Sequence, residues 1–565
     1  NESVSTEASM QTIYDLLTSK KQYLQNTVVI IDPCINPDGR DRYVNWYRQH
    51  KNSPHNVDPN SKEHREGWWS GRSNHYMFDL NRDWAWLTQV ESQQRLPMYN
   101  QWMPHIHVDF HEQSLNSPYY FAPAAEPYHE VITDFQREFQ ETIGKNHALY
   151  FDKEGWFYFT KERFDLFYPS YGDTYPTYNG AIGMTYEQGG SGRAGLGVIT
   201  ATGDTLTLKD RIEHHRTTGL STVEMGAKHA NKLNEEFRKF YRSKNYKYKS
   251  YVLNGSEDKI KSLTNLLNKH EIEYGFANTA SAKGFRYQTG KNGTIPLNDK
   301  SLVISSNQKK GTLVKVLFEP DARLSDSLTY DITAWSLPYA YGLEALASTA
   351  VISTKNTNPY KEEQITNSIV DGAYAYLSSW NSMSDGRFLA DLLKEGVRVR
   401  YARKPFRLEG KKYERGTLII TRADNANNSG FMDILRKLSK KHNRSVDRVA
   451  TGFVDSGKDF GSRDVQLIPE INIGVIMGDP ASTLRYGEVW HFMEQQLGYP
   501  FSALDADYIN NINLDDYNIL VLPEGSGYRR LMGDGFLKKL KSWVSRGGKL
   551  IAMGSAVGSL EGEDG

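Results

Sequence analysis

One histidine stands at a point where α/β proteins commonly place their chemistry. In HVDFHEQ, residues 107–113, apolar and polar residues alternate as in a strand over 105–110, and His111 follows at its end. Open α/β sheets bind ligands at the ends of their strands, where an imidazole can ligate a metal or carry a proton. We interpret His105 and His107 as ordinary polar residues of the strand. His111 is the candidate metal ligand.

A carboxylate occupies a similar position at the end of a second predicted strand, 181–187. Glu187 stands in TYEQGG, directly before two glycines. A carboxylate there is either a solvated strand end or a general base that takes a proton from a reacting group. Its position alone leaves both interpretations open.

An Asn-Arg pair lies among aromatic residues in FDLNRDW. Asn81 and Arg82 are adjacent, and the planar guanidinium fork matches the two oxygens of a carboxylate. The alternative is a structural ion pair of Arg82 with Asp79 or Asp83. Both interpretations remain open from this segment alone.

The elements that must position these residues follow from hydrophobic periodicity. The predicted elements are a helix over 5–25, a strand over 27–32, a helix over 87–102, strands over 105–110 and 181–187, and a helix over 208–238. This alternation predicts an α/β domain over residues 1–235, with helices flanking a sheet. The two strand ends that carry His111 and Glu187 both belong to this domain.

Three further parts are predicted after this domain. Residues 236–325 read as a small α/β module, and residues 326–465 as an uncertain α/β or mixed region. Residues 466–565 alternate strands and helices in a parallel, flavodoxin-like pattern. This last part resembles the class I glutamine amidotransferase-like fold. Its LPEGSG segment, 522–527, lacks the Cys of active members, so we expect a non-catalytic module that continues beyond residue 565.

Composition excludes several classes of protein. The chain has 68 basic and 68 acidic residues, which argues against a nucleic-acid binder. No apolar run approaches the ~20 residues of a membrane span. Cys34 is the single cysteine, so no internal disulfide forms, and we interpret it as a small packed residue rather than a nucleophile. The 35 Tyr and 11 Trp residues suit a secreted or periplasmic protein that handles peptides or glycans. The oligomeric state is not predicted.

Taken in order, five motifs resemble the zinc carboxypeptidase family that includes the pancreatic digestive enzymes. The motifs are Glu2 at the start, NPDG at 36–39, LNRDW at 80–84, DFHEQ at 109–113 and TYEQGG at 185–190. The resemblance covers about residues 1–235 and implies a carboxypeptidase-like mixed sheet with flanking helices. Each motif is short, and the case rests on their order and spacing.

The resemblance implies one catalytic Zn²⁺. Glu2 and His111 would be two of its three protein ligands, and the third would be a His three residues before Glu2. We therefore expect the chain to begin inside the zinc motif. Glu187 would be the general base, and Asp79 would orient the expected upstream His.

The resemblance also implies a substrate site. Arg48 would stabilise the oxyanion, with Arg42 as a second choice. Asn81 and Arg82 would hold the terminal carboxylate of the substrate. The mobile tyrosine of the family corresponds to Tyr168 or Tyr171, of which we carry Tyr171 as the substrate-binding candidate. The position that tunes side-chain preference falls on Gly172 and predicts neither a basic nor an acidic preference.

The sequence therefore predicts a zinc metallocarboxypeptidase that acts on peptide or protein substrates. One alternative is an amidase or deacylase on the same scaffold, acting on peptidoglycan or modified peptides. Another is a degenerate fold that binds peptides or glycans without hydrolysing them. A contact of Arg82 with a free substrate carboxylate distinguishes the first from the second.

Overall fold

The computed structural model describes residues 2–242, 244–324, 329–332, 334–357, 360, 362–367 and 369–560. The chain forms two compact units, one of residues 1–255 with 259–360 and one of residues 256–258 with 361–565. The four-part division expected from the sequence remains a prediction. Its boundary between 325 and 326, and its end at 565, lie outside the described residues.

The first unit begins with a four-stranded sheet. Its strands lie in the order β1 (Ile106–Gln113), β6 (Ile182–Gly189), β2 (Tyr119–Tyr120) and β4 (Tyr158–Phe159). β1 and β6 are parallel and pair residue by residue over their full length. Because β2 is antiparallel to β6, the sheet is mixed, which confirms the predicted α/β fold class.

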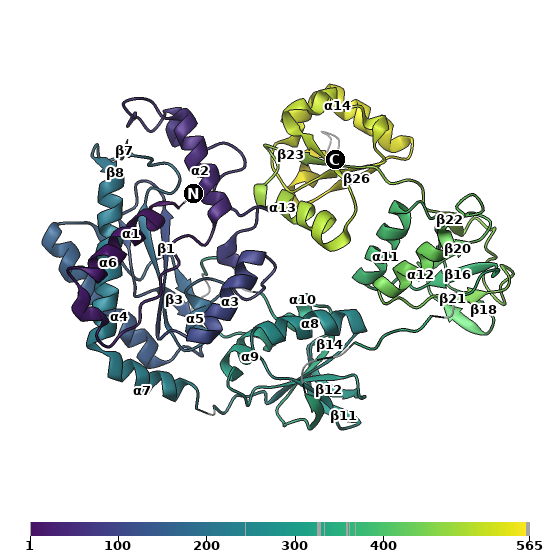
Figure 1. Cartoon of the computed structure of the whole chain (residues 1–565), viewed down its shortest axis with the longest axis horizontal. Helices are drawn as coiled ribbons and strands as arrows, with labels where there is room; N and C mark the ends of the chain where they lie inside the picture. The colour runs from purple at the N-terminus through teal and green to yellow at the C-terminus, as the bar shows by residue number, and fades with distance from the viewer. Residues whose placement is uncertain are drawn as a thin grey trace. The chain divides into compact units, whose positions relative to one another are not determined.

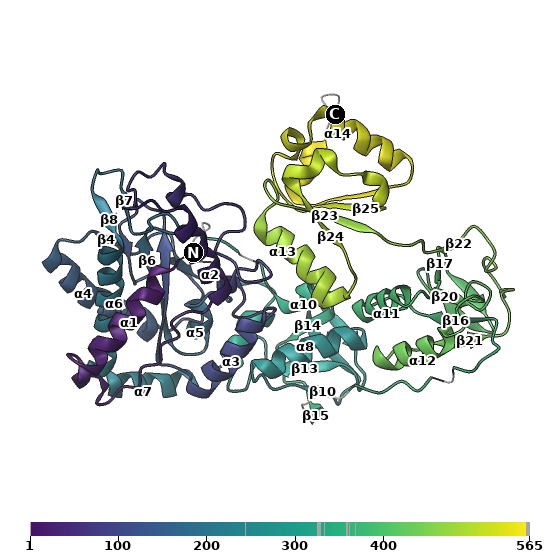
Figure 2. The same ribbon diagram turned by 45° about the horizontal axis from the view of Figure 1, so that its top comes forward.

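Three long helices cover one side of this sheet. They are α1 (Val4–Leu17), α4 (Asp134–Glu154) and α6 (Leu208–Lys228), which lie together in both ribbon views (Figure 1 and Figure 2). The other elements of this part are the helices α2 (Pro37–His50), α3 (Val90–Trp102), α5 (Thr174–Tyr178) and α7 (Ala230–Phe240), the strand pairs β3 (Ala125–Tyr128) with β5 (Asp165–Leu166) and β7 (Gly197–Ile199) with β8 (Thr205–Thr207), and 3-10 turns at Lys21–Leu24, Lys62–His64 and Leu80–Arg82.

Alternation along β1 separates its residues between two sides. The ring of Phe110 packs against His215 of α6, with 5.2 Å between the ring centroids. On the opposite side, His107 packs edge-on against Trp84, also at 5.2 Å. His111 is an even number of residues from His107, so it faces away from α6. The candidate site therefore lies on the side of the sheet opposite α6.

One expected strand is not observed. Residues 27–32 form no strand in the described part of the chain, and Val28 and Ile30 leave 70% and 56% of their surface exposed. The apolar run VVII has strand composition, but a strand also needs a partner for its backbone N–H and C=O groups. No partner strand is present among the described residues.

Two expected helices have different bounds. The helix predicted over 5–25 ends at Leu17, because the next residues, TSKK, offer no apolar side chain to bury. The helix predicted over 208–238 is α6 followed by α7. His229 separates them, with a non-helical backbone at φ −115° and ψ 17°.

A seven-stranded sheet forms the second part of this unit. Its order is β12 (Lys291–Pro296), β11 (Ser281–Arg286), β14 (Glu344–Ser348), β9 (Ser250–Asn254), β13 (Leu302–Ser305), β10 (Gly275–Ala277) and β15 (Thr354–Thr357). Its helices are α8 (Glu257–Lys269), α9 (Gly311–Phe318) and α10 (Leu337–Ala340). One continuous core of buried apolar residues joins the two parts, including Trp84, Tyr175, Leu267 and Phe318.

The second unit contains two sheets. One has the order β21 (Asp447–Val449), β16 (Ala375–Ser378), β20 (Leu418–Thr421), β17 (Arg400–Ala402) and β22 (Val465–Leu467), beside the hairpin β18 (Phe406–Leu408) and β19 (Lys411–Tyr413). Its helices are α11 (Met383–Lys394) and α12 (Phe431–Lys441).

The other sheet of this unit is fully parallel. Its order is β24 (Ser502–Asp505), β23 (Ile473–Met477), β25 (Ile519–Leu522) and β26 (Lys549–Ala552), with helices α13 (Thr483–His491) and α14 (Tyr528–Ser545). The predicted flavodoxin-like alternation is observed here. The resemblance to glutamine amidotransferases remains a prediction. In the LPEGSG segment, Glu524 pairs with Arg485 at 2.9 Å.

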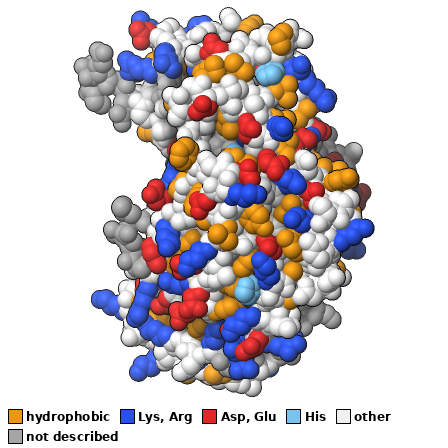
Figure 3. Space-filling view, turned by 90° about the vertical axis from the view of Figure 1, so that its left-hand side faces the viewer, with side chains coloured by type: hydrophobic (Ala, Val, Ile, Leu, Met, Phe, Trp, Pro, Cys, Tyr) orange, Lys and Arg blue, Asp and Glu red, His pale blue; other side chains and the backbone are white. Residues whose placement is uncertain are grey.

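The surface agrees with the charge balance of the sequence. On the face seen in Figure 3, basic and acidic side chains are interspersed. Over the described part of the chain, no helix has both the length and the apolar character needed to cross a membrane.

Candidate active site

The candidate site forms at the carboxyl ends of β1 and β6. In the parallel register of these strands, His111 is the partner of Glu187. Neighbouring strands are about 4.8 Å apart, and paired residues of parallel strands face the same side. His111 and Glu187 leave only 6% and 8% of their surface exposed. The sheet therefore brings two buried titratable groups to one place.

Both ring nitrogens of His111 contact carboxylates. Nδ1 lies 2.6 Å from Oε2 of Glu2, and Nε2 lies 2.8 Å from Oδ2 of Asp109. Burial opposes charge on the imidazole, but Asp109 and Glu2 outweigh it and raise the pKa of His111 well above its usual value. The Asp109 contact is an ion-pair distance only, because its Oδ2 has no hydrogen-bond partner among the described residues, and Nδ1 is directed at Glu2.

The first turn of α1 brings Glu2 to His111. Glu112 lies on the other side of β1 and accepts a hydrogen bond from the backbone N–H of Val4 at 2.9 Å. The second oxygen of Glu112 pairs with Arg211 of α6 at 3.1 Å. This buried ion pair anchors the start of α1, two residues from the candidate ligand Glu2.

Arg72 is the arginine that contacts the cluster of Glu2, Asp109, His111 and Glu187. Its guanidinium contacts Oε1 of Glu2 and lies 3.0 Å from Oδ2 of Asp79. Burial opposes ionisation of Glu2, but Arg72 and His111 outweigh it and hold the pKa of the Glu2 carboxyl below its usual value. Asp79, which we expected to orient a histidine, is thus a partner of Arg72 in this structure.

The structure does not bring Arg48 to the cluster. Arg48, chosen from the sequence as the oxyanion-stabilising residue, lies in α2 with an exposed side chain. Arg42, the second choice, donates to the backbone carbonyls of Ser70 and Ser73 at 2.8 and 3.1 Å. The oxyanion role of Arg48 or Arg42 stays a prediction: α2 turns Arg48 toward solvent and uses Arg42 to hold the loop that carries Arg72.

The NPDG motif has a related structural role. Its Asn36 caps α2 by accepting from the backbone N–H of Gly39 at 3.0 Å, so the motif begins a helix. The Asn36 amide also donates to the carbonyl of Arg72 at 3.1 Å. A Cβ on Gly39 would lie 2.3 Å from the carbonyl oxygen of Gly71. A glycine is therefore needed where α2 meets this loop.

Asn81 joins the histidine to the opposite wall of the site. Its Nδ2 lies 3.0 Å from Nε2 of His111. Its Oδ1 accepts a hydrogen bond from the backbone N–H of Gly172 at 2.7 Å. A Cβ on Gly172 would lie 2.0 Å from Oδ2 of Asp109. Only a glycine therefore lets this segment of the chain approach Asp109 and His111 so closely.

Arg82 and Tyr171 lie together next to Asn81. The guanidinium carbon of Arg82 is 4.5 Å from the centroid of the Tyr171 ring. Of the two tyrosines left open by the sequence, Tyr171 is the one that contacts Arg82. The hydroxyl of Tyr168 instead accepts a hydrogen bond from Trp86 at 2.6 Å.

Glu187 carries a buried carboxyl group beside His111. Its Oε2 is buried and makes no hydrogen bond to any described residue. Burial raises the pKa of Glu187 to about 8, although the nearby His111 opposes this shift. A carboxyl group with a pKa near neutrality can both accept and release a proton.

Glu2 and His111 are the residues of this site that suit a metal ion. A carboxylate oxygen and an imidazole nitrogen directed at each other are ligand types of zinc sites. The buried Oε2 of Glu187 has no hydrogen-bond partner among the described residues, which is consistent with a bound polar species between Glu2, His111 and Glu187. Within the described residues, however, no group of three or more His, Cys, Asp or Glu side chains is arranged to hold a metal.

Residues 1–192 match a family model described as zinc carboxypeptidase. This part of the chain is therefore similar to zinc carboxypeptidases. The sequence resemblance is confirmed, although the match ends at 192 rather than near 235. Every predicted site residue lies within the matched range. No curated protein and no solved structure matches the chain.

Three residues of the candidate site were missed from the sequence. Asp109 precedes His111 by two residues, so strand periodicity could have placed it on the same side. Glu112 follows His111, and its burial on the other side of β1 follows from the same rule. Arg72 lies in a loop, where no periodic signal exists.

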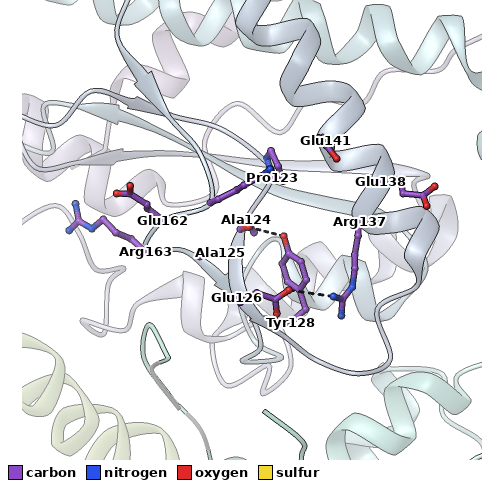
Figure 4. A pocket seen from close by; sticks show the side chains of 11 residues that line it. Pro123, Ala124, Ala125, Glu126, Tyr128, Arg137, Glu138, Glu141, Glu162 and Arg163 are labelled. Carbon is purple, nitrogen blue, oxygen red and sulfur yellow. Dashed lines mark hydrogen bonds and ion pairs between the residues drawn. The ribbon is translucent and has the colours of Figure 1, made fainter. Parts of the chain in front are cut away.

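A separate pocket in the family-matched part of the chain lies outside the candidate site. It has a volume of about 720 Å³ and is lined by residues 123–126, by Tyr128, by α4 and by residues 161–163. Figure 4 shows that Arg137 of α4 points to Glu126 across it. None of the predicted site residues lines this pocket.

Proposed function

We propose that this protein is a metallocarboxypeptidase that uses one catalytic zinc ion to remove the C-terminal residue of peptides or proteins. The contact of Asn81 with His111, at 3.0 Å, is the observation that carries the proposal. The next residue, Arg82, is the candidate clamp for the terminal carboxylate. A substrate held there would have its last peptide bond close to Glu2 and His111.

Glu2 and His111 would provide two ligands for the zinc ion. When bound, zinc activates a water molecule and polarises the scissile carbonyl. Asp109, 2.8 Å from Nε2, would hold the imidazole of His111 in place by its charge and thereby keep Nδ1 toward its ligand position. Arg72 lies on the same side of the cluster and would stabilise negative charge on the carbonyl oxygen.

Glu187 would act as the general base and then as the acid. Its unpartnered Oε2 would take a proton from the attacking water, and the same oxygen would pass that proton to the leaving amine. The raised pKa of this buried carboxyl supports the second step, because a protonated Glu187 persists near neutral pH. Arg82 and Tyr171 would bind the terminal carboxylate through the guanidinium fork and the phenol hydroxyl.

The test uses full-length protein and paired substrates. Glu187→Gln should retain zinc and fold but lose turnover by at least about 100-fold, as for general acid-base groups. Peptides with a free C-terminus should be cleaved far better than the same peptides with an amidated C-terminus. Equal cleavage of both forms would support the amidase or deacylase alternative. A zinc-loaded wild-type protein that cleaves neither would support a binding protein.

We also propose that the protein is secreted or periplasmic and acts without a nucleic-acid partner. The balance of 68 basic against 68 acidic residues supports the second part, and the aromatic-rich composition supports the first. Fractionation of the source cells checks the location. Recovery of the protein only in the cytoplasmic fraction would contradict it.

A further inference from the structure

An aspartate from outside the family-matched range lies on the candidate carboxylate clamp. Asp331 belongs to the segment 329–332, which follows α9 in the second part of the first unit. Its Oδ2 lies 2.9 Å from Nε of Arg82 and 2.9 Å from the second terminal nitrogen. The hydroxyl of Tyr171 donates to the same oxygen at 2.9 Å. One carboxylate oxygen of the chain thus takes three donors of the clamp.

These contacts occupy the hydrogen-bonding edge of Arg82. The remaining terminal nitrogen donates to the backbone carbonyl of Asn81 at 3.2 Å. All three guanidinium nitrogens therefore have partners within the protein. The forked edge, which would bind both oxygens of a substrate carboxylate, faces Asp331.

The neighbours of Asp331 hold it at this position. The backbone N–H of Tyr330 donates to Oδ2 of Asp165 at 2.7 Å. The Tyr330 ring lies 5.3 Å from Phe164, between centroids. On the other side, Ile332 packs against the aromatic cluster that contains Tyr171. The segment is attached to the catalytic domain on both sides of the aspartate.

We infer that Asp331 is an intramolecular competitor of the substrate, a carboxylate that occupies the place of the terminal carboxylate. This inference rests on the proposed function, since it assigns that place to Arg82 and Tyr171. Two carboxylates cannot share one guanidinium fork without strong repulsion, because the pair would carry an excess negative charge. A substrate with a free C-terminus must therefore displace Asp331, and its apparent affinity is lowered by the cost of that displacement.

The test measures peptide binding in full-length protein that carries Glu187→Gln to prevent turnover. The probes are a tripeptide ending in phenylalanine and the same tripeptide with an amidated C-terminus, titrated by calorimetry. Asp331→Asn keeps the shape of the side chain but removes its charge. We expect the free acid to bind about tenfold more tightly to this variant, and the amide to bind as before.

Asp299→Asn is the matched control, because Asp299 is an exposed aspartate of the same seven-stranded part. It should change neither affinity. If the unsubstituted protein discriminates between acid and amide and Asp331→Asn leaves that ratio unchanged, the inference fails alone. Weaker binding of the acid by Asp331→Asn would also overturn it, because Asp331 would then help to hold the substrate. Equal binding of acid and amide by every variant would instead refute the carboxylate role of Arg82, and with it the proposed function.

Discussion

Replacing Glu112 by Gln should release the start of α1 and thereby Glu2. The Glu112 side chain is buried, and its charge is paired with Arg211 at 3.1 Å. The substitution preserves the size of the side chain but leaves the Arg211 charge buried without a counterion. Breaking a buried pair on one side costs ~3 kcal/mol. In a unit of this size, that cost lowers Tm by roughly 4 °C.

The assay combines thermal unfolding with hydrogen exchange. The backbone N–H of Val4 donates to Glu112, so exchange in the first turn of α1 should become faster in the variant. Glu213→Gln is the control: Glu213 lies on the same helix as Arg211, but its side chain is 40% exposed and pairs with Arg216 at the surface. Its loss should cost at most about 1 kcal/mol. Equal Tm shifts for both variants, with unchanged exchange in α1, would refute the anchoring role of Glu112.

Three further predictions concern the loop, the arginine and acid stability. Gly39→Ala should destabilise the protein by ~1–3 kcal/mol, since its Cβ would lie 2.3 Å from the carbonyl oxygen of Gly71. Gly67→Ala is the control, because a Cβ there would lie within 4 Å of no described residue other than its chain neighbours, and equal Tm values for the two variants would contradict the prediction. Arg72→Met should lower kcat of the full-length protein by ~100-fold, whereas Arg48→Met should leave it near wild type. The reverse result would assign the oxyanion-stabilising role to Arg48. Burial lowers the pKa of His147 to about 3, whereas in the unfolded chain it is near 6.5. Between these values only the unfolded chain takes the proton, so the free energy of unfolding should fall as the pH is lowered, by ~2 kcal/mol at pH 5. In urea unfolding, His147→Gln should flatten this pH dependence; an unchanged dependence would assign it to another group.

The parts of the site on regular strands could be predicted from the sequence. His111 and Glu187 were found because each ends an apolar strand, and strand ends are where such sheets bind ligands. The same periodicity also contained Asp109, two residues before His111. The parallel pairing that brings His111 and Glu187 together links segments far apart in the chain, and no local pattern encodes it.

The loop and long-range contacts could not be predicted in the same way. Arg48 and Arg72 both follow the NPDG motif in sequence. Only the path of the loop after α2 decides which of them contacts Glu2. Asp331 is 249 residues from Arg82 in sequence, so their contact depends on how two parts of the first unit pack. The strand expected over 27–32 failed for a related reason, because composition does not supply a pairing partner.

The uninterrupted pairing of β1 with β6 determines which changes of chain length the candidate site can tolerate. Because His111 and Glu187 are direct partners in the register, the interstrand spacing fixes the separation of their backbones. Connecting segments outside the two strands can therefore be lengthened or shortened without changing that separation. One residue inserted in either strand before these positions would turn one of the two side chains to the α6 side of the sheet. Changes of loop length are thus compatible with the pairing of His111 and Glu187, whereas insertions within β1 or β6 are not.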